Sequence, residues 1–199
     1  MDTSLERVED VYELEPHVKV ARARACVLML IVSDALAVLA ILAAGGYLSA
    51  LNTENQFKVA GDFAPPFVPN LLVMIALVLS GLAYFGWERR ARRPGGAGQT
   101  GFFLVALVLM FAAGVAETWI GAALRYGIPI HAYESLLLLI TWFTAVHLVL
   151  AAIIGVLVGG RILRGRLAGH EFIVEAAGYW WYYTVVSSIL LWLFGAFLI

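Results

Sequence analysis

Residues 134–160 read ESLLLLITWFTAVHLVLAAIIGVLVGG, and this stretch decides the fold. After Glu134, its only ionisable residue is His147. An α-helix rises about 1.5 Å per residue, so about 20 apolar residues cross the ~30 Å hydrocarbon layer of a bilayer. The run is continuously apolar and does not alternate with polar residues, which argues against a strand of a membrane barrel. The stretch therefore predicts a transmembrane helix.

Four similar apolar runs lie near residues 25–51, 68–87, 101–124 and 177–199. The 199-residue chain is 62% hydrophobic and 14% charged, whereas a soluble domain averages about 25% charged residues. So much apolar sequence needs lipid as its solvent. We predict an all-α, polytopic membrane protein in which residues 25–199 form a five-transmembrane-helix bundle after a polar tail, residues 1–24. The net charge is −1, and no nucleic acid is expected as a partner.

The distribution of lysine and arginine predicts the orientation of the helices. The tail and the second and fourth connectors hold 11 of the 13 basic residues, and the first and third connectors hold only Lys58 and Arg125. Basic connectors stay on the cytoplasmic side of a membrane. We therefore expect the N-terminus in the cytoplasm and the C-terminus on the outer face.

Three ionisable residues fall at membrane depth, namely Asp34, Glu117 and His147. Such groups are costly in lipid unless they are paired, so each is a candidate functional residue with a role in proton chemistry. The plainer interpretation is structural, because polar groups often bridge helices within a bundle. Glu117 and His147 are expected at similar depths, where they could pair with each other.

The histidines and the cysteine argue against a metal site in this chain. Cys26 is the only cysteine, His17 lies in the tail, and His131 and His170 lie in connectors. Only His147 is intramembrane, whereas a bis-imidazole haem needs two histidines at matched depth. Copper or di-iron sites need three or more ligands together. We expect no metal, no cofactor and no catalytic centre in this chain, which also lacks nucleotide-binding and nucleophile motifs.

Two further patterns indicate close contacts. Tyr179 to Tyr183 read YWWYY at the start of the fifth run. An aromatic belt at the membrane interface explains such a cluster, but five consecutive rings face all sides of a helix, so some must meet protein or line a lipid cleft. Tyr179, Trp180 and Trp181 are therefore candidate lipid or subunit contacts. Arg161 and Arg164 are candidates for binding lipid phosphate at the same level.

The string from Gly155 to Gly159, GVLVG, has the small-xxx-small spacing that lets helices approach closely. This spacing is common by chance. It favours association of the fourth predicted helix with a neighbour.

Together these features resemble subunit III of the haem-copper oxidases, the cytochrome c or quinol oxidases, in its short five-helix bacterial form. The likeness runs from about Val27 to the C-terminus. The positions that match the family's motifs are Ser33, Asp34 and Tyr47 in the first run, Pro69 and Asn70 in the second, Glu117 in the third, His147 in the fourth, and Glu175, Tyr179 and Trp180 around the start of the fifth.

The sequence departs from two motifs of that family. In its Thr-Gly-x-His-Gly-x-His-Val stretch, Trp142 replaces the first glycine and Thr144 replaces the first histidine. In its Tyr-Trp-His-Phe-Val-Asp stretch, Trp181 replaces the histidine and Thr184 replaces the aspartate. These changes favour a divergent branch or an accessory relative.

The resemblance implies a non-catalytic subunit of a terminal oxidase in aerobic respiratory electron transport, in a bacterial plasma membrane. Haem and copper would reside in a partner, subunit I. The chain would hold phospholipid in a cleft between its first two helices and the rest, and it would support proton uptake and the stability of the complex. Asp34 matches an acidic residue in that cleft, where an unpaired carboxyl would be neutral.

Two alternatives remain open. One is the related accessory subunit of a nitric-oxide reductase. The other is a small proton-coupled transporter that uses Asp34, Glu117 and His147 as a relay. Transporters usually show broken helices or inverted repeats, and neither is visible in this sequence.

Overall fold

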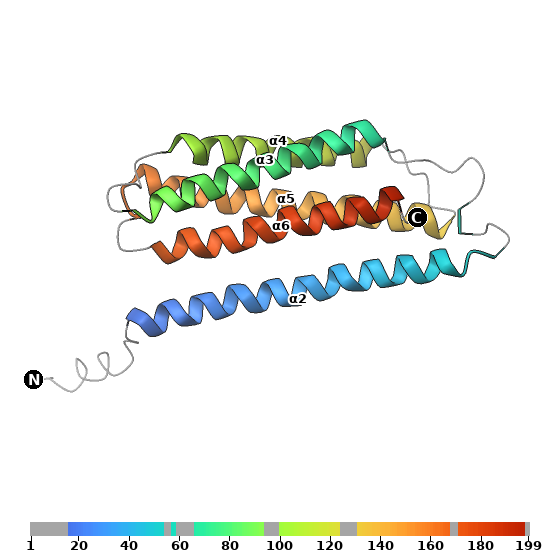
Figure 1. Ribbon diagram of the computed structural model, residues 1–199, viewed down its shortest axis with the longest axis horizontal. Coiled ribbons are helices and arrows are strands. Elements are labelled where there is room, and N and C mark those ends of the chain that lie inside the picture. Colours follow the sequence, from blue (N-terminus) through green and yellow to red (C-terminus); the bar gives the residue numbers. More distant parts are fainter. Residues whose placement is uncertain are drawn as a thin grey trace, which may run out of the picture.

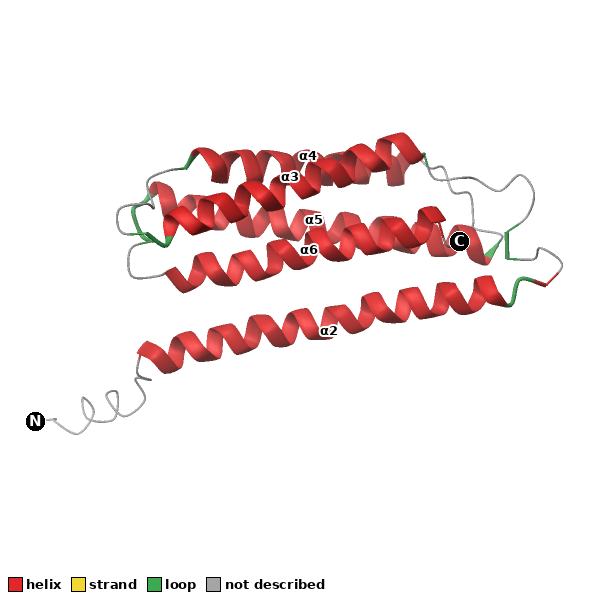
Figure 2. Ribbon diagram, viewed as in Figure 1, coloured by secondary structure: helices red, strands yellow, loops and turns green. Residues whose placement is uncertain are grey.

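The computed structural model describes residues 16–53, 57–58, 66–93, 100–123, 131–167 and 171–197. This part of the chain contains five helices and no strands (Figures 1 and 2). They are α2 (Pro16–Ala50), α3 (Phe67–Ala91), α4 (Gly101–Ala123), α5 (Ala132–Leu163) and α6 (Glu171–Phe197). All five are long and apolar enough to cross a membrane. The predicted all-helical membrane architecture is confirmed, and the direction in which the helices cross remains a prediction.

Two helices begin earlier than the apolar runs indicated. α2 begins at Pro16 rather than near residue 25, and α6 begins at Glu171 rather than near residue 177. Glu175, which the sequence placed before the fifth helix, is therefore helical. Because a helix satisfies its own backbone hydrogen bonds, it can continue beyond the hydrocarbon layer into sequence whose side chains are polar. Residues 1–15 of the predicted tail, together with Arg125 and His170, lie outside the described residues.

The end of α5 has a clear local cause. Gly165 adopts a positive φ of 63°, a conformation that favours glycine. The N–H of Gly165 donates to the Ile162 carbonyl at 3.0 Å, and the N–H of Arg166 donates to the Arg161 carbonyl at 2.9 Å. These bonds satisfy the last carbonyl groups of the helix. The chain turns here, with Arg161 and Arg164 at the end of α5.

Helices α3, α4, α5 and α6 form a four-helix bundle. Each packs against two neighbours, in the cyclic order α3, α4, α5, α6 and back to α3. The centre is filled by large side chains that are almost fully buried, including Trp87, Trp181, Tyr84, Phe103, Leu77 and Met110. Only the interior faces of the four helices are buried. The outer faces remain exposed and are apolar, as contact with lipid requires.

Helix α2 lies outside this bundle, alongside α6 (Figure 1). Only 6% of the residues in its most apolar window are buried, against 39–50% in the other four helices. Its apolar contacts gather late in the helix, where Val38 and Ile41 join a cluster with Leu136 and Phe194. Gly45 makes the closest approach: a Cβ there would lie 2.6 Å from Leu136 Cδ2 and from Phe194 Cε1. Earlier in α2, polar contacts hold the helix to the bundle.

Candidate functional site

A cleft opens between α2, α5 and α6. Its volume is about 930 Å³. Most of its wall is aliphatic, from residues such as Val27, Leu30 and Ile154, and its polar lining includes Asp34 and His147. An elongated apolar molecule with a few polar groups would match this lining. The implied position of the cleft, between the first two helices and the rest, is therefore wrong, because α3 packs within the four-helix bundle and α2 alone lies outside it.

Asp34, His147 and Tyr183 form a polar triad, contributed by α2, α5 and α6. His147 Nε2 lies 2.9 Å from Asp34 Oδ2, and the Tyr183 hydroxyl donates to the same oxygen at 2.5 Å. The side chain of His147 is 8% exposed and that of Asp34 is 20% exposed. The triad therefore ties the outlying helix α2 to two helices of the bundle.

The hydrogen bonds of His147 restrict where protons can sit. Nδ1 lies 2.7 Å from the Phe143 carbonyl oxygen, which can only accept, so Nδ1 carries a proton. The contact between Nε2 and Asp34 then needs one more proton, on either the imidazole or the carboxyl. The ring is fixed between Phe143 and Trp180, with centroid distances of 4.2 and 5.8 Å. The pair thus holds a shared proton in a fixed geometry facing the cleft.

Glu117 is not part of this triad. It lies on α4, and its Oε2 is buried without a hydrogen-bond partner among the described residues. The expected pairing of Glu117 with His147 is therefore wrong. Depth along the membrane was compatible with that pair, but His147 points toward α2 and Glu117 into the four-helix core. Asp34 was expected to be neutral if its carboxyl had no partner. Because it is paired with His147 and Tyr183, that expectation does not apply.

A second polar contact joins α2 to α6 near the start of both helices. Arg24 forms an ion pair with Glu175 at 2.6 Å, and the Tyr179 hydroxyl donates to the other carboxyl oxygen of Glu175 at 2.5 Å. The guanidinium is 48% exposed and the carboxyl 11%. This contact holds the first few turns of α2 and α6 together.

The aromatic cluster is divided among different environments. Trp181 is fully buried in the bundle, where its Nε1 donates to Ser80 Oγ at 3.1 Å and its ring stacks on Tyr84 at 4.8 Å. Its proposed role as a lipid or subunit contact is therefore wrong, because the chain's own core covers it. Trp180 is 6% exposed and lines the cleft beside His147. The belt interpretation fails for both tryptophans, and the expectation that some rings meet protein or line a cleft is confirmed.

A third polar contact joins Tyr182 of α6 to α3. The Tyr182 hydroxyl donates to Glu88 of α3, and Arg92 bonds the other oxygen of Glu88 at 2.5 Å. The pKa of the Arg92 guanidinium is raised, mainly by its hydrogen bond to Glu88. Neither Glu88 nor Tyr182 was a candidate from the sequence. For Tyr182 the available signal was the run of five consecutive aromatics, whose rings must contact several neighbouring helices.

Arg161 and Arg164 line the cleft at the end of α5. Both side chains are exposed, and the turn at Gly165 follows directly. A cationic pair at one end of an apolar cleft is suited to an anionic headgroup. The structure thus brings these two arginines together with Trp180, Asp34 and His147 around one space.

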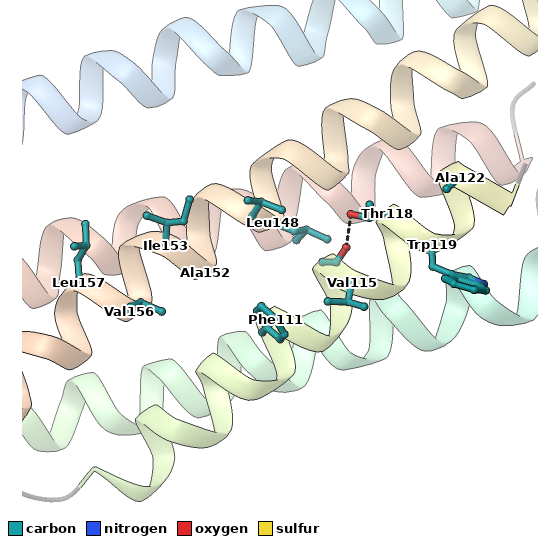
Figure 3. Close-up of a pocket in the computed structure, with 12 residues that line it drawn as sticks. Phe111, Val115, Thr118, Trp119, Ala122, Leu148, Ala152, Ile153, Val156 and Leu157 are labelled. Atoms are coloured by element: carbon teal, nitrogen blue, oxygen red, sulfur yellow. Dashed lines mark hydrogen bonds between the residues drawn. The ribbon is translucent and has the colours of Figure 1, made fainter.

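A second hollow, of about 520 Å³, lies between α4 and α5 on the lipid-facing side (Figure 3). Its lining includes Phe111, Trp119 and Ile153 and is almost wholly apolar. The polar side chain there, Thr118, donates to the Gly114 carbonyl at 2.7 Å (Figure 3). The lining of this groove therefore makes almost only apolar contacts available to a ligand.

The described residues contain no group of three or more His, Cys, Asp or Glu side chains that could hold a metal ion. No protein-family model matches the sequence, and no curated protein matches it. The site is therefore interpreted from its own geometry.

Proposed function

We propose that this chain is the non-catalytic subunit III of a haem-copper terminal oxidase in a bacterial plasma membrane. The observation that carries the proposal is the triad of Asp34, His147 and Tyr183, which faces an apolar cleft beside the first membrane helix. The oxidase resemblance implies an acidic residue at the position of Asp34, in a lipid cleft between the first two helices and the rest; here the cleft beside Asp34 is bounded by the first, fourth and fifth membrane helices. Haem and copper would belong to subunit I, and this chain would support its stability and proton uptake.

Bound phospholipid is the second part of the proposal. The cleft has aliphatic walls suited to acyl chains, and Arg161 and Arg164 of its lining supply positive charge suited to a phosphate group. The shared proton of Asp34 and His147 lies deeper, beside the acyl chains. Lipid in this position would fill the space between α2 and the bundle, where protein packing is sparse.

Co-purification tests the assignment. The tagged full-length chain is extracted from its own membrane in mild detergent, and the visible spectrum and the accompanying chains are recorded. We expect haem bands and a large hydrophobic partner. A colourless protein without a partner would contradict the proposal and favour a proton-coupled transporter. Nitric oxide consumption by the complex, without oxygen consumption, would instead indicate an accessory subunit of a nitric-oxide reductase.

Lipid binding gives a separate prediction. A basic side chain near an anionic surface contributes about 1 kcal/mol, so each of Arg161→Gln and Arg164→Gln should weaken binding of anionic phospholipid about fivefold. Native mass spectrometry of the purified protein measures the retained lipid. Arg93→Gln is the matched control, because Arg93 is also exposed but lies at the end of α3, away from the cleft. Equal lipid retention in all three variants would refute a headgroup site at the cleft.

A further inference from the structure

Four buried side-chain oxygens on the bundle helices have no hydrogen-bond partner among the described residues. Tyr133 Oη is near the start of α5, and the other three are Glu117 Oε2 on α4, and Thr184 Oγ1 and Ser188 Oγ on α6. These last three residues are 5%, 0% and 2% exposed. Thr184 and Ser188 are four residues apart on α6 and so lie on the same face of that helix. A buried polar group without a partner destabilises a folded protein, and such groups are rare in native structures.

Contacts with α5 fix the depth of Glu117. Gly114 of α4 lies against Leu148 of α5, and Gly121 lies against Thr141. Glu117 is between the two glycines, so it is level with the middle of the segment from Thr141 to Leu148. A long side chain on a helix leans toward the N-terminus of that helix. The carboxyl of Glu117 is therefore displaced toward the level of Leu148.

The depth of Ser188 follows in the same way. Gly155 of α5 lies against Trp181 of α6, and Leu137 lies against Gly195. Ser188 is midway between Trp181 and Gly195, so it is level with the middle of the segment between Leu137 and Gly155. At about 1.5 Å per residue this is within one helical turn of Glu117. Glu117 and Ser188 thus lie within one helical turn of each other in depth, and Thr184 lies about one turn of α6 from Ser188.

The ionisable group at this depth, His147, is not available to Glu117. The imidazole nitrogens of His147 are taken by Asp34 and by the Phe143 carbonyl. An ionised carboxylate would be costly in this interior, because no cation in the described part of the chain is bonded to it. A buried water typically makes about three hydrogen bonds to polar groups that otherwise lack partners. Three such oxygens are present here.

We propose that Glu117, Thr184 and Ser188 form a buried water site in which Glu117 is a neutral carboxylic acid. The Glu117 hydroxyl donates to the water, and the water donates to Thr184 Oγ1 and Ser188 Oγ. This arrangement gives the water three hydrogen bonds and needs no added charge. The bundle would then hold a second proton, separate from the proton shared by Asp34 and His147. The proposal does not depend on the oxidase assignment, since it uses only residues of the four-helix core.

Infrared spectroscopy tests the protonation state. The full-length protein in mild detergent at neutral pH should show the carbonyl band of a protonated carboxylic acid. Glu117→Gln should remove this band, and Asp34→Asn should leave it in place. Thr184→Val and Ser188→Ala should each shift its frequency, because each removes one bond of the shared water. A missing band, or a band that neither α6 variant moves, would overturn the proposal.

The direction in which Thr184→Val changes the melting temperature tests whether the site holds a water. If Thr184 Oγ1 truly lacks a partner, the isosteric change Thr184→Val removes an unsatisfied group and raises the melting temperature. If the hydroxyl binds water, the same change lowers it, and we expect a fall of about 2–4 °C. Thr118→Val is the control, because Thr118 lies in the lipid-facing groove and bonds its own helix. A rise for Thr184→Val, or a fall equal to that of the control, would overturn the water site.

Discussion

Replacement of Asp34 by alanine is expected to be one of the two most damaging single changes in the membrane domain. The substitution removes the carboxyl group that is hydrogen-bonded to both His147 and Tyr183. An interhelical hydrogen bond between membrane helices averages about 0.6 kcal/mol and reaches about 1.7 kcal/mol, so the loss of two should cost about 1–3 kcal/mol. Apolar packing cannot make up the difference, because so little of α2 is buried. Reversible unfolding of the purified protein in mixed detergent micelles, followed by tryptophan fluorescence, measures the loss.

A double-mutant cycle separates this bond from general damage. Asp34→Ala and Tyr183→Phe remove the two ends of one hydrogen bond, so their effects should sum to more than the effect of the double variant. Val32→Ala serves as the control, because Val32 is 61% exposed on the same helix and should change stability little. Strict additivity of the two changes would show that the triad does not hold α2 in place.

The number and type of helices could be predicted from the sequence, because each apolar run is long enough to cross a bilayer without a partner. Helix ends were less predictable. α2 and α6 continue into polar sequence at Pro16 and Glu171, where hydropathy no longer reports on the helix. The turn at Gly165 had no distinct signal, because this glycine is one of 19 in the chain.

The candidate site could be predicted only in part. Asp34, His147 and Glu117 were identified by their cost in lipid, but the sequence did not tell which two would meet. A soluble helix shows its buried face by an apolar stripe, whereas a membrane helix is apolar toward both lipid and protein. The sequence therefore carries no pattern that shows how α2, α4 and α5 are rotated about their axes. For the same reason Trp181, inside the bundle, could not be distinguished from Trp180 at the cleft.

Replacement of Gly155 by alanine is the second change expected to have a large effect. A Cβ at this position would lie 2.7 Å from Leu107 Cδ1 and 2.9 Å from Trp181 Cζ3. Leu107 can rotate away, but Trp181 cannot, because it is fully buried, bonded to Ser80 and stacked on Tyr84. Overpacking of a closely packed core costs about 1–3 kcal/mol. The unfolding measurement described for Asp34 should therefore show a clear loss of stability.

The neighbouring glycines of α5 make the test specific. A Cβ at Gly160 would meet nothing within 4 Å, so Gly160→Ala causes no clash and gains the better helix propensity of alanine. At Gly159 a Cβ would lie 3.2 Å from Phe103 Cε1, so a cost between the two is expected. The order of stability should be Gly160→Ala above Gly159→Ala above Gly155→Ala. If Gly155→Ala were as stable as Gly160→Ala, Trp181 would not be held against α5, and the close packing of α5 with α6 would be refuted.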